Sequence, residues 1–295
     1  FYDHRRSAIK YQEWKMKISI TLGEQQYNVN TDFGHSLAIA LDFDRSENQP
    51  NHFGAAPALA KPMQASGFIG DTTQGGSCNV FELSFNPHCN GTHTETIGHI
   101  CDQDNALALS ISALELPPLM PCALISLTPI KASDTTDQYS PSFSVHDKVI
   151  SRQQLEQSLA TYPDIQLQSV VVRTLPNSAD KCQANYNQAN QPAFFTRDAV
   201  LYLNERGVEH LVLDLPSLDR LNDDGLLTCH HIFWQVKEGV HQPSSNSLIN
   251  KTITEMAYIN NSLHDGFYFM SLQIPAFVND AAPSRPMLYQ AERLS

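Results

Sequence analysis

The sequence lacks the features that would make it a membrane-spanning or nucleic-acid-binding protein. No apolar run in its 295 residues approaches the length of roughly 20 residues needed to cross a bilayer. Basic residues are few, with 19 Lys and Arg against 31 Asp and Glu, and the formal net charge is -12. A chain this acidic is repelled by phosphate backbones. We therefore expect no membrane and no nucleic acid among its partners.

Cysteine is also sparse. The six cysteines are scattered through a long chain, which is not the pattern of a disulfide scaffold. The first 20 residues contain no apolar segment of the kind that forms the core of a signal peptide. Together these absences predict a cytoplasmic protein. Met16 would serve as a natural start, so residues 1–15 are predicted to be an N-terminal extension or a cloning remnant.

What is present is typical of a globular α/β protein. Hydrophobic residues make up 41% of the chain, enough for a substantial core. Residues 44–78 are rich in Gly, Pro, Ser and Asn and are predicted to be one long loop region. Alternating or short apolar runs predict strands or hairpins at residues 16–30, 79–85, 121–130, 165–175 and 266–277.

Two helices have clear start signals. Ser151 followed by Gln154 fits a capping box and predicts a helix over residues 151–162. A second helix is predicted to begin at Thr196 and to end at Gly207, directly before the apolar strand "VEHLVLDL". Strand, helix and strand with short joins indicate a crossover unit in a sheet. We predict one α/β domain over residues 16–295, with a mixed β-sheet core and flanking helices.

The segment "NPHCNGTHTETIGHI", residues 86–100, concentrates metal-capable side chains. Its threonines and two glycines disfavour helix and favour an extended chain. Alternate side chains of an extended chain point the same way, so Cys89, His93, Glu95 and His99 would share one face. The threonines would face the other way and hold the strand by hydrogen bonds. Imidazole, thiolate and carboxylate suit Zn²⁺, Mn²⁺ or Fe²⁺ better than Ca²⁺ or Mg²⁺. The alternative interpretation is a polar surface loop whose histidines bond backbone or water.

The same segment resembles the signature of the cyclase family of metal-dependent hydrolases, which includes kynurenine formamidase (arylformamidase) and isatin hydrolase. That signature is His-x-x-x-His-x-Asp-x-x-x-His, with Gly-Thr or Gly-Ala before the second His. Here Gly91 and Thr92 form the Gly-Thr pair directly before His93. His93 then matches the second signature His, Glu95 matches the Asp, and His99 matches the last His.

Two positions depart from the signature. The first signature His falls on Cys89, and His88, one residue earlier, is the alternative ligand. The signature Asp is replaced by Glu95, whose side chain is one methylene longer. A cysteine thiolate also binds zinc, so these departures bear on which metal is preferred.

The resemblance extends over roughly residues 80–290. The segment "LLTCHHIFW" resembles the family segment that supplies a fourth ligand, with His230 the better match and His231 the alternative. The segment "ITEMAYI" resembles the one that supplies a glutamate ligand, here Glu255. The spacing between them is longer than usual in the family, so residues 237–251 are interpreted as an insertion near the site. Further matches are an Asp-x-x-Ser-x-Asp unit and a closing Arg-Pro pair: Asp214, Ser217, Asp219, Arg285 and Pro286.

The resemblance implies a fold, a cofactor and an activity. The fold would be the swivelling β/β/α type, and the cofactor one or two divalent metal ions, Zn or Mn. The activity would be hydrolysis of an amide C–N bond, in a formamide or lactam, of a small aromatic substrate by a metal-activated water. His99 would be the proton shuttle. The implied metal ligands are Cys89, His93, Glu95, His230 and Glu255.

The family commonly forms homo-oligomers, which predicts a dimer or a tetramer. Two other functions remain open from the sequence. One is a catalytically silent member that binds a metal or a small ligand, because two signature positions have changed. The other is a cyclase or dehydratase on the same scaffold.

Overall fold

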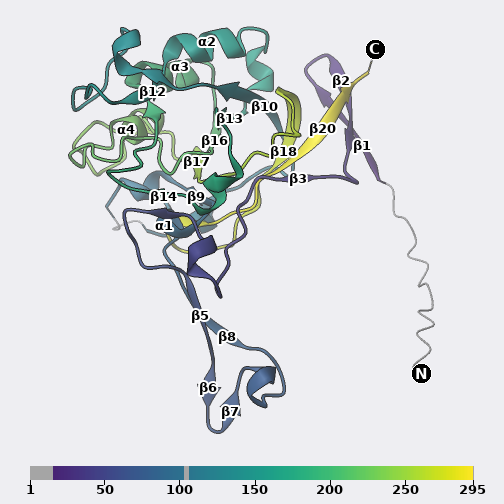
Figure 1. Cartoon of the computed structure of the whole chain (residues 1–295). Coiled ribbons are helices and arrows are strands. Elements are labelled where there is room, and N and C mark those ends of the chain that lie inside the picture. Colours follow the sequence, from purple (N-terminus) through teal and green to yellow (C-terminus); the bar gives the residue numbers. More distant parts are fainter. Residues whose placement is uncertain (1–15, 103–105, 295) are drawn as a thin grey trace.

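A mixed sheet of eleven strands forms the centre of the protein (Figure 1), whose computed structural model describes residues 16–102 and 106–294. Four neighbouring strands are parallel, and antiparallel strands extend the sheet on both sides. This mixed α/β architecture confirms the predicted fold class. The strands, in spatial order, are β1 (Lys17–Leu22), β2 (Gln25–Asn30), β20 (Met287–Arg293), β18 (Gly266–Ser271), β10 (Met120–Leu127), β13 (Ser169–Thr174), β16 (His210–Leu213), β17 (Thr252–Glu255), β9 (His93–Glu95) and β19 (Ala281–Pro283), with β3 (His35–Ser36) paired to β20.

Both faces of the central strands are buried, as expected of parallel strands. Alternate side chains of β13 enter two different hydrophobic clusters, with Val170 and Val172 in one and Val171 in the other. The first cluster also holds the apolar stripes of three helices, so these helices cover one face of the sheet. They are α2 (Arg152–Leu159), α3 (Arg197–Glu205) and α4 (Thr228–Phe233).

The local signals that predicted α2 and α3 are confirmed. The Ser151 hydroxyl and the Gln154 side chain form a capping box at the start of α2. Thr196 accepts a hydrogen bond from the third residue of α3, and Gly207 follows the helix with a φ of 72°.

The metal-capable segment is extended only in its middle. β9 is a strand, but residues 87–90 form a helical turn, α1 (Pro87–Asn90), and η3 (Ile97–His99) is a 3-10 turn. The expectation of one extended segment is therefore wrong at both ends. Pro87 suits the first position of a helix, and the Asn86 and Thr96 side chains cap the two turns by accepting backbone N–H groups.

β9 is held on both edges. It pairs antiparallel with β17, where His93 lies opposite Glu255, and with β19 on its other side. Thr94 points away from the histidines, and its hydroxyl lies 2.7 Å from the Thr254 hydroxyl and 2.8 Å from that of Ser284. The predicted role of this threonine in holding the strand is confirmed.

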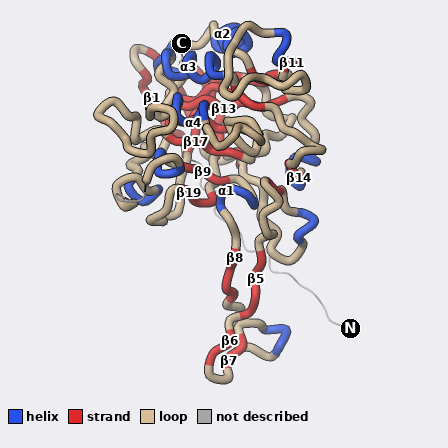
Figure 2. The backbone as a smooth tube through the Cα atoms, turned by 90° about the vertical axis from the view of Figure 1, so that its left-hand side faces the viewer, coloured by secondary structure: helices blue, strands red, loops and turns tan. Residues whose placement is uncertain are grey.

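Residues 44–78 are more ordered than the sequence predicts. They contain η1 (Ser46–Asn48), β4 (Asn51–His52), β5 (Leu59–Pro62), β6 (Gln64–Ala65), β7 (Phe68–Ile69) and η2 (Thr72–Gln74). β5 pairs with β8 (Phe81–Ser84) and β6 pairs with β7, forming an arm that projects from the body (Figures 1 and 2). The long-loop prediction is wrong because these strands are held mainly by backbone pairing. Their side chains are largely exposed, so no hydrophobic periodicity marks them.

The remaining elements are short. β4 pairs with β14 (Asn185–Tyr186), and a separate three-stranded sheet contains β11 (Ile130–Lys131), β12 (Lys148–Ile150) and β15 (Phe194–Phe195). Further 3-10 turns are η5 (Ile111–Ala113), η6 (Ala132–Asp134), η7 (Asp164–Gln166) and η8 (Ala179–Gln183). Across the described ranges, no helix has the length and apolar character that a bilayer crossing requires. The prediction for residues 1–15 lies outside the described residues.

Candidate metal centre

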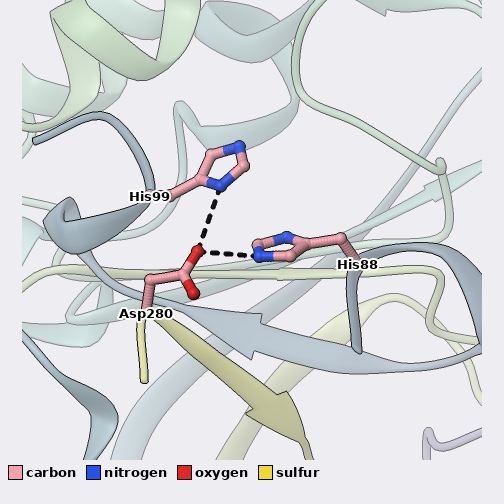
Figure 3. A group of neighbouring side chains, drawn as sticks. All are labelled: His88, His99 and Asp280. Atoms are coloured by element: carbon pink, nitrogen blue, oxygen red, sulfur yellow. Dashed lines mark hydrogen bonds and ion pairs between the residues drawn. The ribbon is translucent and has the colours of Figure 1, made fainter. Parts of the chain in front are cut away.

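Imidazole and carboxylate side chains from six segments meet at the edge of the large sheet that carries β9. We call this group the cluster; its members are His88 of α1, His93 and Glu95 of β9, His99 of η3, His230 of α4, Glu255 of β17, and Asp280, which precedes β19. Figure 3 shows His88 and His99 both directed at Asp280. The fold therefore joins residues that are far apart in the chain.

Glu95 lies at the centre of the cluster. Its Oε1 is 2.9 Å from His230 Nε2, and its Oε2 is 3.1 Å from His88 Nδ1 and 3.8 Å from His99 Nδ1. The side chain is fully buried, and burial alone would raise its pKa. The surrounding imidazoles outweigh burial and hold the pKa of Glu95 well below its usual value. A carboxylate in this position remains negatively charged and available to a cation.

Two histidines are held so that one ring nitrogen faces the cluster. His93 Nδ1 donates to the carbonyl of Gly91 at 3.0 Å, which leaves Nε2 directed at Glu255 Oε2, 3.6 Å away. His230 Nδ1 donates to Asp219 Oδ2 at 2.6 Å, and its Nε2 faces Glu95. A hydrogen bond from the second ring nitrogen to a carboxylate or carbonyl is the usual support of a metal-ligating histidine.

Whether these residues fit a metal ion can be judged from the buried polar atoms that lack a hydrogen bond. In the described part of the chain, four buried atoms face oppositely charged groups without a hydrogen bond of acceptable geometry: His93 Nε2, His230 Nε2 and both carboxylate oxygens of Glu95. An unpaired buried polar group costs about 1–3 kcal/mol, so four in one place call for a missing partner. Three sets of histidine and carboxylate atoms each lie within 4.8 Å of one another: His88, His93 and Glu95; Glu95, His99 and His230; and His88, His99 and Asp280. This donor set fits Zn²⁺ or Mn²⁺.

The structure brings together most of the residues predicted from the sequence, namely His93, Glu95, His99, His230 and Glu255. Cys89 is different, since none of the metal-capable sets among the described residues includes its sulfur. His88 lies in two of these sets instead, because successive side chains of the α1 turn point in different directions. His231, the alternative to His230, is turned away and has Nδ1 3.3 Å from the carbonyl of Val236. The ligand roles themselves stay predictions.

Two aspartates hold histidine rings of the cluster in place. Asp280, which sequence reasoning missed, accepts a hydrogen bond from His88 Nε2 at 2.8 Å and lies 3.3 Å from His99 Nδ1. Asp219, noted only as part of the Asp-x-x-Ser-x-Asp unit, orients His230. Asp214 of the same unit is a structural residue instead, because it is buried against the ammonium of Lys181 at 2.6 Å.

A pair of substitutions separates the two candidates for the first ligand. We expect His88→Ala to lower metal affinity more than Cys89→Ser, because His88 contacts Glu95 and Asp280 whereas the Cys89 sulfur lies in none of the metal-capable sets. Equilibrium titration of both variants with Zn²⁺ and Mn²⁺ measures this difference. A larger loss in Cys89→Ser, above all for Zn²⁺, would restore the cysteine as the ligand.

Metal binding is expected to release protons. Burial alone would lower the pKa of His88, but its hydrogen bond to Asp280 and the nearby carboxylate of Glu95 raise it to about 10. The metal-free protein therefore holds a proton on His88 at pH 7 that the cation must displace, so affinity rises with pH over the neutral range. Calorimetric titration with Zn²⁺ at pH 7, in two buffers of different ionisation enthalpy, measures the protons released. Equal heats in the two buffers would contradict this expectation.

Comparisons with known proteins identify the family to which this fold and cluster belong. The Cyclase family model, described as "Putative cyclase", matches residues 17–220, and the chain belongs to this family. No curated protein matches the chain.

Solved structures with the same fold include two isatin hydrolases. One, bound to the product analogue thioisatinate, has a TM-score of 0.57 at 12% identity, covering 88% of this chain and 92% of that one. Isatin hydrolase A from Labrenzia aggregata has a TM-score of 0.55 at 14% identity, covering 88% and 94%. A predicted metal-dependent hydrolase from Bacillus stearothermophilus has a TM-score of 0.52 at 15% identity, covering 87% and 98%. At these identities the likeness concerns the fold.

Proposed function

We propose that the protein is a metal-dependent hydrolase that cleaves the C–N bond of an amide, a formamide or a lactam, in a small aromatic substrate. The observation that carries the proposal is the set of buried nitrogen and oxygen atoms on His93, Glu95 and His230 that face one another without a hydrogen bond of acceptable geometry. Membership of the Cyclase family and the shared fold of two isatin hydrolases support it.

The residues that would hold the cation are His93, Glu95, His230 and Glu255, with His88 in place of Cys89. The ion, Zn²⁺ or Mn²⁺ with one or two per chain, supplies an activated water and polarises the carbonyl when bound. Glu95, which lies against His88, His99 and His230, would be the central carboxylate of this ligand set. Asp219 fixes the ring of His230 and thereby the direction of its free nitrogen.

His99 is the residue of the cluster best placed to move a proton. Its side chain is 26% exposed, whereas those of His93 and His230 are fully buried. Asp280 lies beside its Nδ1 and holds the ring, while the other nitrogen points away from Asp280 (Figure 3). In this role His99 takes a proton from the attacking water and passes it to the leaving nitrogen.

Two measurements on purified protein test the proposal. Elemental analysis is expected to find a divalent transition metal, and isatin or formanilide is expected to be hydrolysed, with the ring-opened acid or free amine as product. Bound metal without turnover on a panel of formamides and lactams would favour the catalytically silent binder. Products formed by ring closure or loss of water would favour the cyclase or dehydratase.

A further inference from the structure

The carboxylate of Asp219, which orients His230, is itself held by four hydrogen bonds. Its Oδ2 accepts from the backbone N–H of His230 at 3.0 Å and from the imidazole Nδ1 at 2.6 Å. Its Oδ1 accepts from the backbone N–H of Cys229 at 2.8 Å and from the Tyr139 hydroxyl at 2.7 Å. Three of these donors belong to α4, the helix that carries His230. The fourth, Tyr139, comes from a loop 80 positions before Asp219 in the chain.

The partners of the Tyr139 hydroxyl determine where its proton points. The backbone N–H of Arg220, 3.0 Å away, can only donate, so the hydroxyl oxygen is the acceptor of that bond. An ionised carboxylate can only accept, so the hydroxyl donates its proton to Asp219. The hydroxyl therefore joins the backbone at residue 220 to the carboxylate at residue 219, with each partner in its proper role.

The ring of Tyr139 is held by aromatic packing. The residue is buried, and its ring centroid lies 4.7 Å from that of Phe194 and 6.1 Å from that of Phe143. The guanidinium of Arg220 lies 5.5 Å from the same centroid. Phe194 belongs to β15, in the three-stranded sheet that is separate from the large one. A side chain fixed in this way loses little further rotamer freedom when its hydroxyl bonds a carboxylate.

Tyr139 is a neutral donor, which suits a carboxylate that supports a metal ligand. Asp214, five residues earlier than Asp219, is paired with the ammonium of Lys181 at 2.6 Å. In the described structure no lysine or arginine forms an ion pair with Asp219, and its ion-pair partner is His230. A cation at Asp219 would compete with the imidazole for the negative charge, whereas a hydroxyl fixes the oxygen and leaves most of that charge facing His230.

We propose that Tyr139 is a positioning residue of the cluster, which acts through Asp219 to fix the direction of the His230 ring. The hydroxyl fixes Oδ1 of the carboxylate, and Oδ2 of the same carboxylate fixes the imidazole Nδ1. The opposite ring nitrogen, Nε2, then lies 2.9 Å from Glu95 Oε1, at the centre of the cluster. The inference rests on the proposed function in one respect, that the group which His230 would meet is a metal ion. It assigns a part in metal binding to the loop at residues 135–147, which supplies no ligand.

Removal of the single hydroxyl tests the proposal. Tyr139→Phe keeps the ring and its packing but takes one donor from Asp219. We expect the affinity for Zn²⁺ and Mn²⁺, measured by equilibrium titration, to fall by roughly 10- to 100-fold, as is typical when a supporting residue is lost. Tyr202→Phe is the matched control, because Tyr202 is also buried and its hydroxyl accepts from Arg206 at 2.6 Å. The control should bind metal like the wild type, and an unchanged affinity in Tyr139→Phe would overturn the proposal.

A double-mutant cycle with Asp219→Asn distinguishes action through the carboxylate from a general loss of stability. Residues of one hydrogen-bond network have non-additive effects. In the Asp219→Asn background, Tyr139→Phe is therefore expected to change metal affinity by no more than about twofold, because the carboxylate that the hydroxyl holds is already gone. An equal loss in both backgrounds would show that Tyr139 acts by another route and would overturn the proposal.

A measurement on the metal-free protein separates this proposal from the hydrolase itself. The proton between His230 Nδ1 and Asp219 is expected to give a downfield NMR resonance, assigned by its loss in His230→Asn. It should shift in Tyr139→Phe and stay in place in Tyr202→Phe. If the wild type binds no metal or cleaves no amide while this pattern is seen, the proposed function fails and the positioning role stands. A resonance that moves in neither variant, or equally in both, would reject Tyr139, and this comparison decides the matter if Asp219→Asn fails to fold.

Discussion

His93→Ala is expected to lose bound metal and hydrolysis together. His93 is fully buried, its Nδ1 donates to the carbonyl of Gly91, and its Nε2 faces Glu255 at 3.6 Å without a hydrogen bond. Removing the ring deletes one ligand and leaves the opposing carboxylates of Glu95 and Glu255 less compensated. The fall in affinity should exceed the 10–100-fold that is typical when only an outer supporting residue is lost.

Elemental analysis after dialysis and kcat/KM measured on the same sample check this result. His210→Ala serves as the control, because it removes another buried histidine of the large sheet whose partner is Thr252 rather than the cluster. The control should retain its metal. Full metal content in His93→Ala would remove this residue from the ligand set.

His99→Ala, by contrast, is expected to retain the metal and to lose turnover. His99 is the most exposed histidine of the cluster, and its contacts are to carboxylates that other histidines also contact. Loss of a general acid–base residue typically lowers the rate by roughly 10²- to 10⁴-fold. Single-turnover kinetics with elemental analysis of the same preparation measure the two effects side by side.

Rescue by added imidazole gives a second readout for His99. A free base in solution should restore part of the rate in His99→Ala but not in His93→Ala, because only the first variant retains its metal. Full turnover in His99→Ala without any added base would end the proton-shuttle assignment. Loss of metal from His99→Ala would make His99 a ligand instead.

Local chemistry explains which parts of the fold could be predicted. The starts of α2 and α3 depend on capping side chains a few residues away, Ser151 and Thr196, and both helices begin where these residues place them. The central strand β13 was also expected, because its apolar run is buried on both faces. The arm formed by β5 and β8 was missed, because its stability comes from backbone pairing that no side-chain pattern records.

The site was predictable where ligands share one motif and less so where they come from separate segments. His93 and Glu95 lie two residues apart on a strand, and their common face follows from strand geometry. The choice between His88 and Cys89 depended on whether residues 87–90 form a turn of helix. Asp280 joins the cluster from 192 positions beyond His88, and no local pattern distinguishes it from the other aspartates of the chain.

The arm affects how the chain would tolerate a protease. Its outer end turns at Ser66 and Gly67, both with positive φ, well away from the large sheet (Figure 2). A nick there divides the polypeptide between β4 and the residues of the cluster, yet it cuts through no strand of the eleven-stranded sheet. The shorter fragment would remain attached through β2, β3 and β4, which pair with β20 and β14 of the longer one.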